Sequence, residues 1–157
     1  MTSHELDALD RRILYALQRE ARHTSSSDIA ASLDVSASTV RNRIQRLEDA
    51  DVIEGYHAAV DYEATGHQFF TLIVCTAPIP DREVLAAAAA EVPGVVEVQE
   101  VMTGDANVLV RAVGVDTDDL TRIGEDLDDL GLRVSDEDLI RSIHRRSYSQ
   151  FGPDDVE

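Results

Sequence analysis

The chain has 157 residues, of which 43% are hydrophobic, so it is long enough for one large domain or two small ones. Its longest mostly apolar stretch, residues 69–79, is too short to span a bilayer, and its first nine residues lack the pattern of a secretory signal, so we expect a cytoplasmic protein with no membrane partner. The single cysteine, Cys75, excludes an intramolecular disulfide and a cysteine-based zinc site, and its apolar neighbours predict that it is packed in a core.

The formal net charge of −17 argues at first against a polyanionic partner such as DNA. The charge is uneven, however, because residues 1–60 carry a net charge of −3 and residues 61–157 a net charge of −14. All fourteen basic residues are arginine, and the acids are scattered, as on the solvated surface of a halophile's protein. At about 1 M salt the Debye length is roughly 3 Å, so repulsion from DNA would be screened. Net charge therefore does not exclude DNA binding.

The first sixty residues predict three helices. The apolar residues at positions 6, 9, 13, 14 and 17 recur at helical spacing and indicate an amphipathic helix that ends near Arg22, with Asp7 and Asp10 among the polar residues on its other faces. The polar cluster 23–27 offers N-caps for a short second helix that contains Ile29, Ala30 and Leu33. Ser36 is a good N-cap for a third helix that runs to about Asp49. Three helices joined by so short a turn fit a helix-turn-helix.

The third helix presents two different faces. On a helical wheel Val40, Ile44 and Leu47 form one narrow apolar stripe that predicts contact with a core. Amide, hydroxyl and guanidinium groups occupy the other faces, with Arg43 nearer the edge of the core, and no carboxylate occurs from Val35 to Gln45. Asn and Gln can bond to adenine, Arg to guanine, and hydroxyls to bases or phosphates. We therefore predict double-stranded DNA as a partner, contacted by Ser36, Ser38, Thr39, Arg41, Asn42, Arg43, Gln45 and Arg46.

The remaining elements complete an α+β chain of two domains. Residues 52–61 predict a short two-stranded ribbon, which makes residues 1–60 a winged helix-turn-helix, followed by a linker over 61–68. Strands are predicted at 69–76, 95–102, 108–115 and within 132–143, with helices at 81–91 and from 117 to about 130. The order β-α-β-β-α-β is the ferredoxin-like plan, here expected over residues 69–150. Residues 151–157 are expected to be a mobile acidic tail.

Three segments, residues 9–14, 35–48 and 52–53, resemble the Lrp/AsnC (feast/famine) transcriptional regulators of bacteria and archaea, and with the acidic composition they indicate a halophilic archaeon. The chain departs from the family where Asn42 and Gln45 replace usually basic residues and where Asp51 replaces a glycine. The resemblance implies a regulator without a cofactor, a homodimer formed through the second domain, and assembly of dimers into tetramers or octamers. It also implies an effector, an amino acid or related metabolite, bound between dimers near the turn of the second domain's hairpin.

That turn, residues 103–107, is similar to the family's Gly-x-x-Asp motif except that Asn107 replaces the usual acid. The resemblance implies effector binding by Thr103, Gly104, Asp105 and Asn107, with Asp136 or Asp138 compensating for the missing carboxylate. The alternative is that Gly104 and Asp105 simply form a hairpin turn.

Two other functions compete with a regulator. Some proteins that resemble this family are siroheme decarboxylases, and His57, His67 and His144 are the residues that such an enzyme could use, but their spacing matches no metal or catalytic motif. The other competitor is an assembly module that keeps the fold without contacting DNA. The acid-free face of the third helix favours a DNA-binding regulator with no enzymatic activity.

Overall fold

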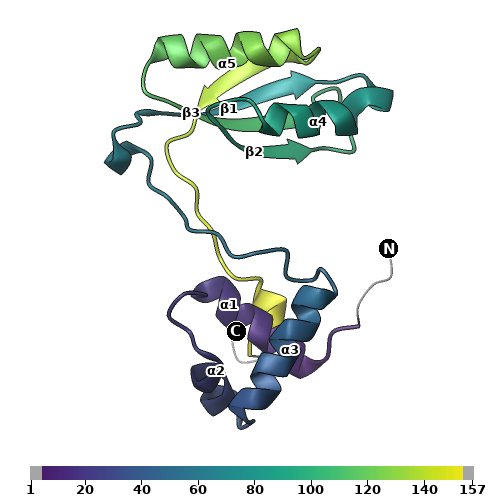
Figure 1. The fold of residues 1–157 in the computed structure, drawn as a ribbon, viewed down its shortest axis with the longest axis vertical. Helices are drawn as coiled ribbons and strands as arrows, with labels where there is room; N and C mark the ends of the chain where they lie inside the picture. The colour runs from purple at the N-terminus through teal and green to yellow at the C-terminus, as the bar shows by residue number, and fades with distance from the viewer. Residues whose placement is uncertain (1–4, 154–157) are drawn as a thin grey trace. The chain divides into compact units, whose positions relative to one another are not determined.

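The computed structural model describes residues 5–153, and the chain divides into two compact units (Figure 1). The first unit consists of the described residues up to Ala58 together with those from His144 onward, and the second spans Ala59–Ile143. Residues 144–150, which were expected to close the second domain, therefore belong to the first unit. No described helix combines the length and apolar character needed to cross a bilayer.

The first unit contains α1 (Ala8–Arg19), α2 (Ser26–Leu33) and α3 (Ala37–Asp49), in agreement with the three predicted helices. Each begins where a side chain caps it: Asp7, Ser25 and Ser36 accept the backbone N–H three residues further on. The first helix ends earlier than the predicted Arg22, because Glu20 is extended and its carboxylate accepts the backbone N–H groups of the two residues at positions 22 and 23.

The core of the first unit lies between these three helices. Ile13, Val40 and Leu47 are fully buried, and Ile29 is almost so. The helical stripe predicted for the third helix is thereby confirmed, with Ile44 packed at the margin of the same cluster. After α3 the backbone of Asp51 is left-handed, with φ 53°, a conformation that favours glycine, the residue that the family resemblance implies there.

The two-stranded ribbon predicted over residues 52–61 is not formed in the described chain. Val52 and Ile53 both donate their N–H groups to the carbonyl of Leu47, at 2.9 and 3.1 Å, and both side chains pack on the helical core. Two consecutive residues turned toward the core break the alternation of a strand. The following residues, 54–61, are exposed and have no partner strand. The prediction of a ribbon was therefore wrong in detail, although the three-helix part of the domain is as expected.

The C-terminal segment returns to the first unit and packs on α1 through η3 (Ser149–Phe151). Phe151 joins the helical core cluster, and the backbone N–H of Tyr148 donates to Gln18 Oε1 at 3.0 Å. The expectation of a mobile tail from residue 151 was wrong for residues 151–153, because an aromatic side chain at its start is stabilised by burial. Residues 154–157 lie outside the described part of the chain.

The second unit begins with η1 (Glu63–Thr65) in the predicted linker and continues with the expected β-α-β-β-α-β order. Its elements are β1 (Phe69–Thr76), η2 (Ile79–Asp81), α4 (Arg82–Ala90), β2 (Val95–Glu100), β3 (Val108–Gly114), α5 (Thr117–Asp129) and β4 (Arg133–Leu139). The four strands form one antiparallel sheet in the order β2-β3-β1-β4. This confirms the ferredoxin-like plan, with the two central strands contributed by β1 and β3.

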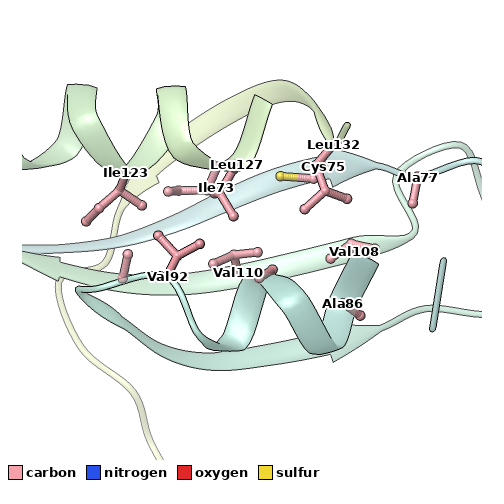
Figure 2. Close-up of a cluster of buried hydrophobic side chains, with 12 residues drawn as sticks. Ile73, Cys75, Ala77, Ala86, Val92, Val108, Val110, Ile123, Leu127 and Leu132 are labelled. Atoms are coloured by element: carbon pink, nitrogen blue, oxygen red, sulfur yellow. The ribbon is translucent and has the colours of Figure 1, made fainter. Parts of the chain in front are cut away.

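The helices α4 and α5 cover one face of the sheet, and the core lies between these helices and the sheet (Figure 2). Ile73, Val110, Ile123 and Leu127 are among its buried side chains. Cys75 is also fully buried there, as predicted, and burial raises the pKa of its thiol to about 11. The thiol is therefore protonated at neutral pH and behaves as a small apolar side chain.

Candidate nucleic-acid interface

The N-terminus of α3 carries three hydroxyl groups in one hydrogen-bonded cluster. Ser36 Oγ accepts the backbone N–H of Thr39 at 3.1 Å, and it also lies 2.9 Å from Ser38 Oγ and 2.7 Å from Thr39 Oγ1. The first of these bonds makes Ser36 the cap of the helix. The cluster therefore both starts α3 and places hydroxyls beside the unpaired N–H groups of a helix N-terminus, where anionic groups bind favourably.

The middle of α3 exposes the side chains that the sequence predicted to contact base edges. Arg41, Asn42 and Gln45 are exposed; Asn42 and Gln45 lie opposite the fully buried Val40 and Leu47, and Arg41 flanks them. Within the described chain, no hydrogen bond or ion pair of the Arg41 or Asn42 side chain is present, whereas Gln45 Nε2 donates to Asp49 Oδ1 at 2.9 Å. Arg41 and Asn42 are thus the two members of the predicted set whose side chains form no hydrogen bond or ion pair within the described residues.

Arg43 and Arg46 differ from the rest of the predicted set because a buried carboxylate holds both. Arg43 Nη1 donates to Asp10 Oδ1 at 3.0 Å, and Arg46 Nη2 donates to Asp10 Oδ2 at 2.9 Å. The Asp10 side chain is fully buried, whereas 27% of the Arg43 side chain and 49% of the Arg46 side chain are exposed. Each oxygen of one carboxylate therefore binds one guanidinium, and the pair fixes α3 against α1.

Asp7 extends this ion-pair cluster at the start of α1. Its carboxylate accepts the backbone N–H of Asp10 at 2.8 Å and forms an ion pair with Arg43. These two interactions, the backbone hydrogen bond first, lower the pKa of the Asp7 carboxyl, and the hydrogen bonds to Asp7 and Asp10 raise the pKa of the Arg43 guanidinium. The N-cap of α1 is thereby coupled electrostatically to a side chain of α3.

The position of Asp10 differs from the sequence analysis, which placed it on a polar face of the first helix. At 100° per residue, however, Asp10 falls in the middle of the stripe formed by Leu6, Ile13, Leu14 and Leu17. An acid at the centre of an apolar stripe indicates a buried carboxylate that needs cationic partners. That signal indicates burial, whereas the identity of the partners, Arg43 and Arg46, depends on how α1 and α3 pack.

The hairpin turn of the second unit places the predicted effector residues in two different environments. Thr103, Gly104 and Asp105 are exposed, and Gly104 has φ 96°, which favours glycine. Asn107 is buried instead, and its amide bonds to both backbone groups of Ala77: the N–H of Ala77 donates to Oδ1 at 2.8 Å, and Nδ2 donates to the carbonyl at 2.9 Å. The amide of Asn107 thus closes the hairpin against the end of β1, with both its oxygen and its nitrogen hydrogen-bonded to Ala77.

We expect Asn107→Asp to lower the free energy of unfolding by about 2 kcal/mol at pH 7, because a buried carboxylate cannot donate to the Ala77 carbonyl. Burial would raise the folded-state pKa of this new acid above its unfolded value, so the free energy of unfolding of the variant is higher at low pH, where the acid is protonated, and falls as the pH rises. The deficit should shrink toward pH 4, where a protonated carboxyl can donate again. Urea unfolding at both pH values measures this, with the exposed Asp105→Asn as the control. An equal deficit at both pH values would contradict the assigned bonds.

The two acids predicted to compensate at the effector site lie on β4, away from the turn. Asp136 is opposite Val74 and Asp138 is opposite Leu72 in the pairing of β1 with β4. Two strand spacings, about 10 Å, therefore separate them from β3. Within one chain the structure does not bring Asp136 or Asp138 together with residues 103–107.

The three histidines considered for an enzyme show no shared site. His67 Nδ1 lies 2.9 Å from Thr65 Oγ1, whereas His57 lies in the exposed segment after α3, and His144 opens the C-terminal segment of the first unit. Among residues 5–153, no group of three histidine, cysteine or acidic side chains is arranged to hold a metal ion.

Comparison with known proteins agrees with this architecture. A family model for winged helix-turn-helix DNA-binding domains matches residues 6–54. An uncharacterised HTH-type transcriptional regulator from Pyrococcus horikoshii is 36% identical over 121 residues, which cover 75% of this chain and 78% of the relative. Two solved structures share the fold at lower identity. They are AsnC of Escherichia coli (20% identical, TM-score 0.69, covering 90% of this chain and 97% of AsnC) and a Neisseria meningitidis transcriptional regulator solved as a complex with L-Met (24% identical, TM-score 0.71, covering 92% and 96%). The chain therefore belongs to the Lrp/AsnC family of DNA-binding, HTH-type transcriptional regulators.

Proposed function

We propose that this regulator binds pseudo-palindromic sites in double-stranded DNA as a homodimer, with Arg41 and Asn42 as its principal base contacts. The observation that carries the proposal is the combination on α3 of these two exposed side chains, unbonded within the described residues, with Val40 and Leu47 fully buried on another face. Ser38 and Gln45 extend the same exposed surface, and the hydroxyls of Ser36 and Thr39 would bind phosphates at the N-terminus of the helix.

Arg43 and Arg46 would contribute differently to DNA binding. Asp10 accepts only one of the nitrogens of Arg46, and half of this side chain is exposed, so its other N–H groups remain able to bind a phosphate. Arg43 is bound by two carboxylates and is the less exposed of the two. We therefore assign Arg43 mainly to the positioning of α3. Arg46 would help to position α3 and would also contact a phosphate of the DNA backbone.

The open face of the sheet supports the proposed dimer. Leu72, Val74 and Leu109 are half-buried there, on the side of the sheet opposite α4 and α5. Arg111 lies among them, paired with Glu97, and its Nε is buried without a hydrogen-bond partner in the described chain. A second copy would cover the apolar side chains and could supply an acceptor for Arg111. Such a dimer would present two α3 helices to successive major grooves about 34 Å apart, and the family resemblance suggests further assembly into tetramers or octamers.

An amino acid or related metabolite is the proposed effector. The L-Met complex of the Neisseria relative supports this class of ligand. Thr103, Gly104 and Asp105 are exposed and available, but the amide of Asn107 is engaged by Ala77, so its part would be to hold the turn. Asp136 and Asp138 would take part only if a neighbouring subunit brought them to the turn. The effector would act by binding one assembly more tightly than another.

The DNA interface is tested by the double variant Arg41→Ala with Asn42→Ala. Each bidentate contact to a base contributes about 1–3 kcal/mol, so we expect the affinity for sites selected from random DNA to fall at least tenfold. Fluorescence anisotropy at constant ionic strength measures this, and Arg11→Ala removes an equal charge from the exposed face of α1 as a control. Retention of full affinity by the double variant would contradict the assigned interface, and loss of the dimer would show that its effect is indirect.

A further inference from the structure

A basic groove lies entirely within the first unit, between α1 and the C-terminal segment. It has a volume of about 780 Å³, which is within the usual range for small-molecule sites. None of its lining residues belongs to α3, so it is separate from the proposed base contacts. The lining residues on which the argument rests are Tyr15, Arg19, Arg145, Arg146, Ser147 and Ser149.

The walls of this groove are fixed by packing. Phe151 is inserted in the helical core, and its ring meets that of Tyr148 edge to face, with centroids 4.9 Å apart. Gly152 lies so close to α1 that a Cβ added there would be 3.1 Å from a ring carbon of Tyr15. In Figure 1 the segment is the yellow stretch that lies against α1. Arg145 and Arg146 are therefore held beside α1 by the packing of Phe151 and Gly152, which follow them in the chain.

The charge of the groove is opposite to that of the chain. Three of the fourteen arginines line it, and among residues 5–153 no acidic residue does. Arg19, Arg145 and Arg146 are exposed, and none of them forms an ion pair with another described residue. Carboxylates bind five of the eleven arginines that lie outside the groove, namely Arg43, Arg46, Arg82, Arg111 and Arg122.

A second observation at the same place is an unpaired polar atom. Ser147 Oγ is buried and has no hydrogen-bond partner in the described chain. A buried hydroxyl of this kind is costly unless a ligand or solvent satisfies it. Within the part of the chain that the structure describes, the groove thus combines three guanidinium groups without an ion-pair partner and a hydroxyl without a hydrogen-bond partner.

We propose that this groove binds phosphoryl groups. Guanidinium forks match phosphate oxygens in pairs, several cations together favour a multivalent anion, and the hydroxyls of Ser147, Ser149 and Tyr15 can donate to the remaining oxygens. The phosphoryl group has two possible sources, a free phosphorylated metabolite or the DNA backbone. The proposal concerns a site apart from both the amino-acid effector turn and the base contacts, and it does not require either of them.

Isothermal titration calorimetry with inorganic pyrophosphate, at an ionic strength fixed with NaCl, tests the free anion. We expect saturable binding to the full chain that weakens at least tenfold in Arg145→Gln with Arg146→Gln. The matched control, Arg133→Gln with Arg141→Gln, removes the same charge from exposed positions outside the groove and should change the affinity less than twofold. Ser147→Ala should weaken pyrophosphate binding without lowering the thermal midpoint, since it removes an unsatisfied hydroxyl.

The DNA source is tested with the same variants and a duplex of unselected sequence. If backbone phosphates occupy the groove, the groove variant lowers the slope of log K against log salt by about 0.9 for each phosphate that it no longer neutralises, and the control variant does not. Loss of pyrophosphate binding identifies a free anion, and loss of salt slope alone identifies DNA. The proposal is overturned if groove and control variants behave alike in both measurements. Arg41→Ala with Asn42→Ala should leave pyrophosphate binding unchanged, which separates this result from a failure of the base contacts.

Discussion

Replacement of Asp10 by asparagine should lower the free energy of unfolding of the first unit by about 3 kcal/mol, near the lower end of the range for breaking a buried ion pair. The carboxylate is fully buried and binds two guanidinium groups, whereas an amide carries no charge and directs its own N–H groups at one of them. The expected decrease in the free energy of unfolding is near the lower end of this range because Arg43 and Arg46 both keep some access to water. Urea unfolding followed by circular dichroism measures it, provided that the m-value is unchanged.

Asp7→Asn is the matched control for this prediction. Asn caps helices as well as Asp does, so the substitution removes one charge from the same cluster and keeps the cap of α1. About half of the Asp7 side chain is exposed, so we expect a loss below about 1 kcal/mol. If the two variants were equally stable, Asp10 would not be the residue that fixes α3 against α1.

A second large effect is expected for Gly94→Ala at the start of β2. Gly94 has φ 98°, and an added Cβ would lie 2.7 Å from Ile123 Cδ1 and 3.1 Å from the carbonyl oxygen of Val113. Ile123 is fully buried between α5 and the sheet, so it cannot move without disturbing the core. A left-handed backbone costs a non-glycine residue about 1–2 kcal/mol and overpacking about 1–3 kcal/mol, so we expect a total on the order of 3 kcal/mol.

Gly131→Ala separates the two contributions. Gly131 has nearly the same backbone, with φ 102°, but nothing lies within 4 Å of an added Cβ. Its thermal or urea stability should therefore show the backbone cost alone, about 1–2 kcal/mol. The excess loss in Gly94→Ala reports the contact with Ile123, and equal losses in the two variants would show that this contact is relieved without cost.

The sequence pattern was sufficient for those elements whose apolar residues repeat regularly. The stripe through Val40 and Leu47 located α3 and its inward face, and the strand predicted at residues 69–76 has the bounds of β1. Periodicity is informative there because each residue's environment follows from its own helix or strand.

Features that depend on distant segments were less predictable. Asp10 becomes tolerable in a core only when α3 supplies Arg43 and Arg46, thirty-three and thirty-six residues later. Similarly, Phe151 was assigned to a tail because no local pattern shows that it meets α1. Asn107 was placed at a ligand site by resemblance, whereas its burial depends on the backbone of Ala77 thirty residues away. In each case the missing information is a tertiary partner, which overrides the local signal.

The return of residues 144–153 makes the DNA-binding unit discontinuous in the chain. An expression fragment that stops at residue 60 would lack Phe151, which packs on its helical core, so its DNA affinity would be lower than that of the intact regulator. Conversely, a protease cut between residues 59 and 143 would leave two polypeptides that remain associated through Phe151 and the Gln18 hydrogen bond. A conformational change that an effector produces in the second unit would reach the three helices of the first unit through two covalent connections, one at each end of the second unit, rather than through one.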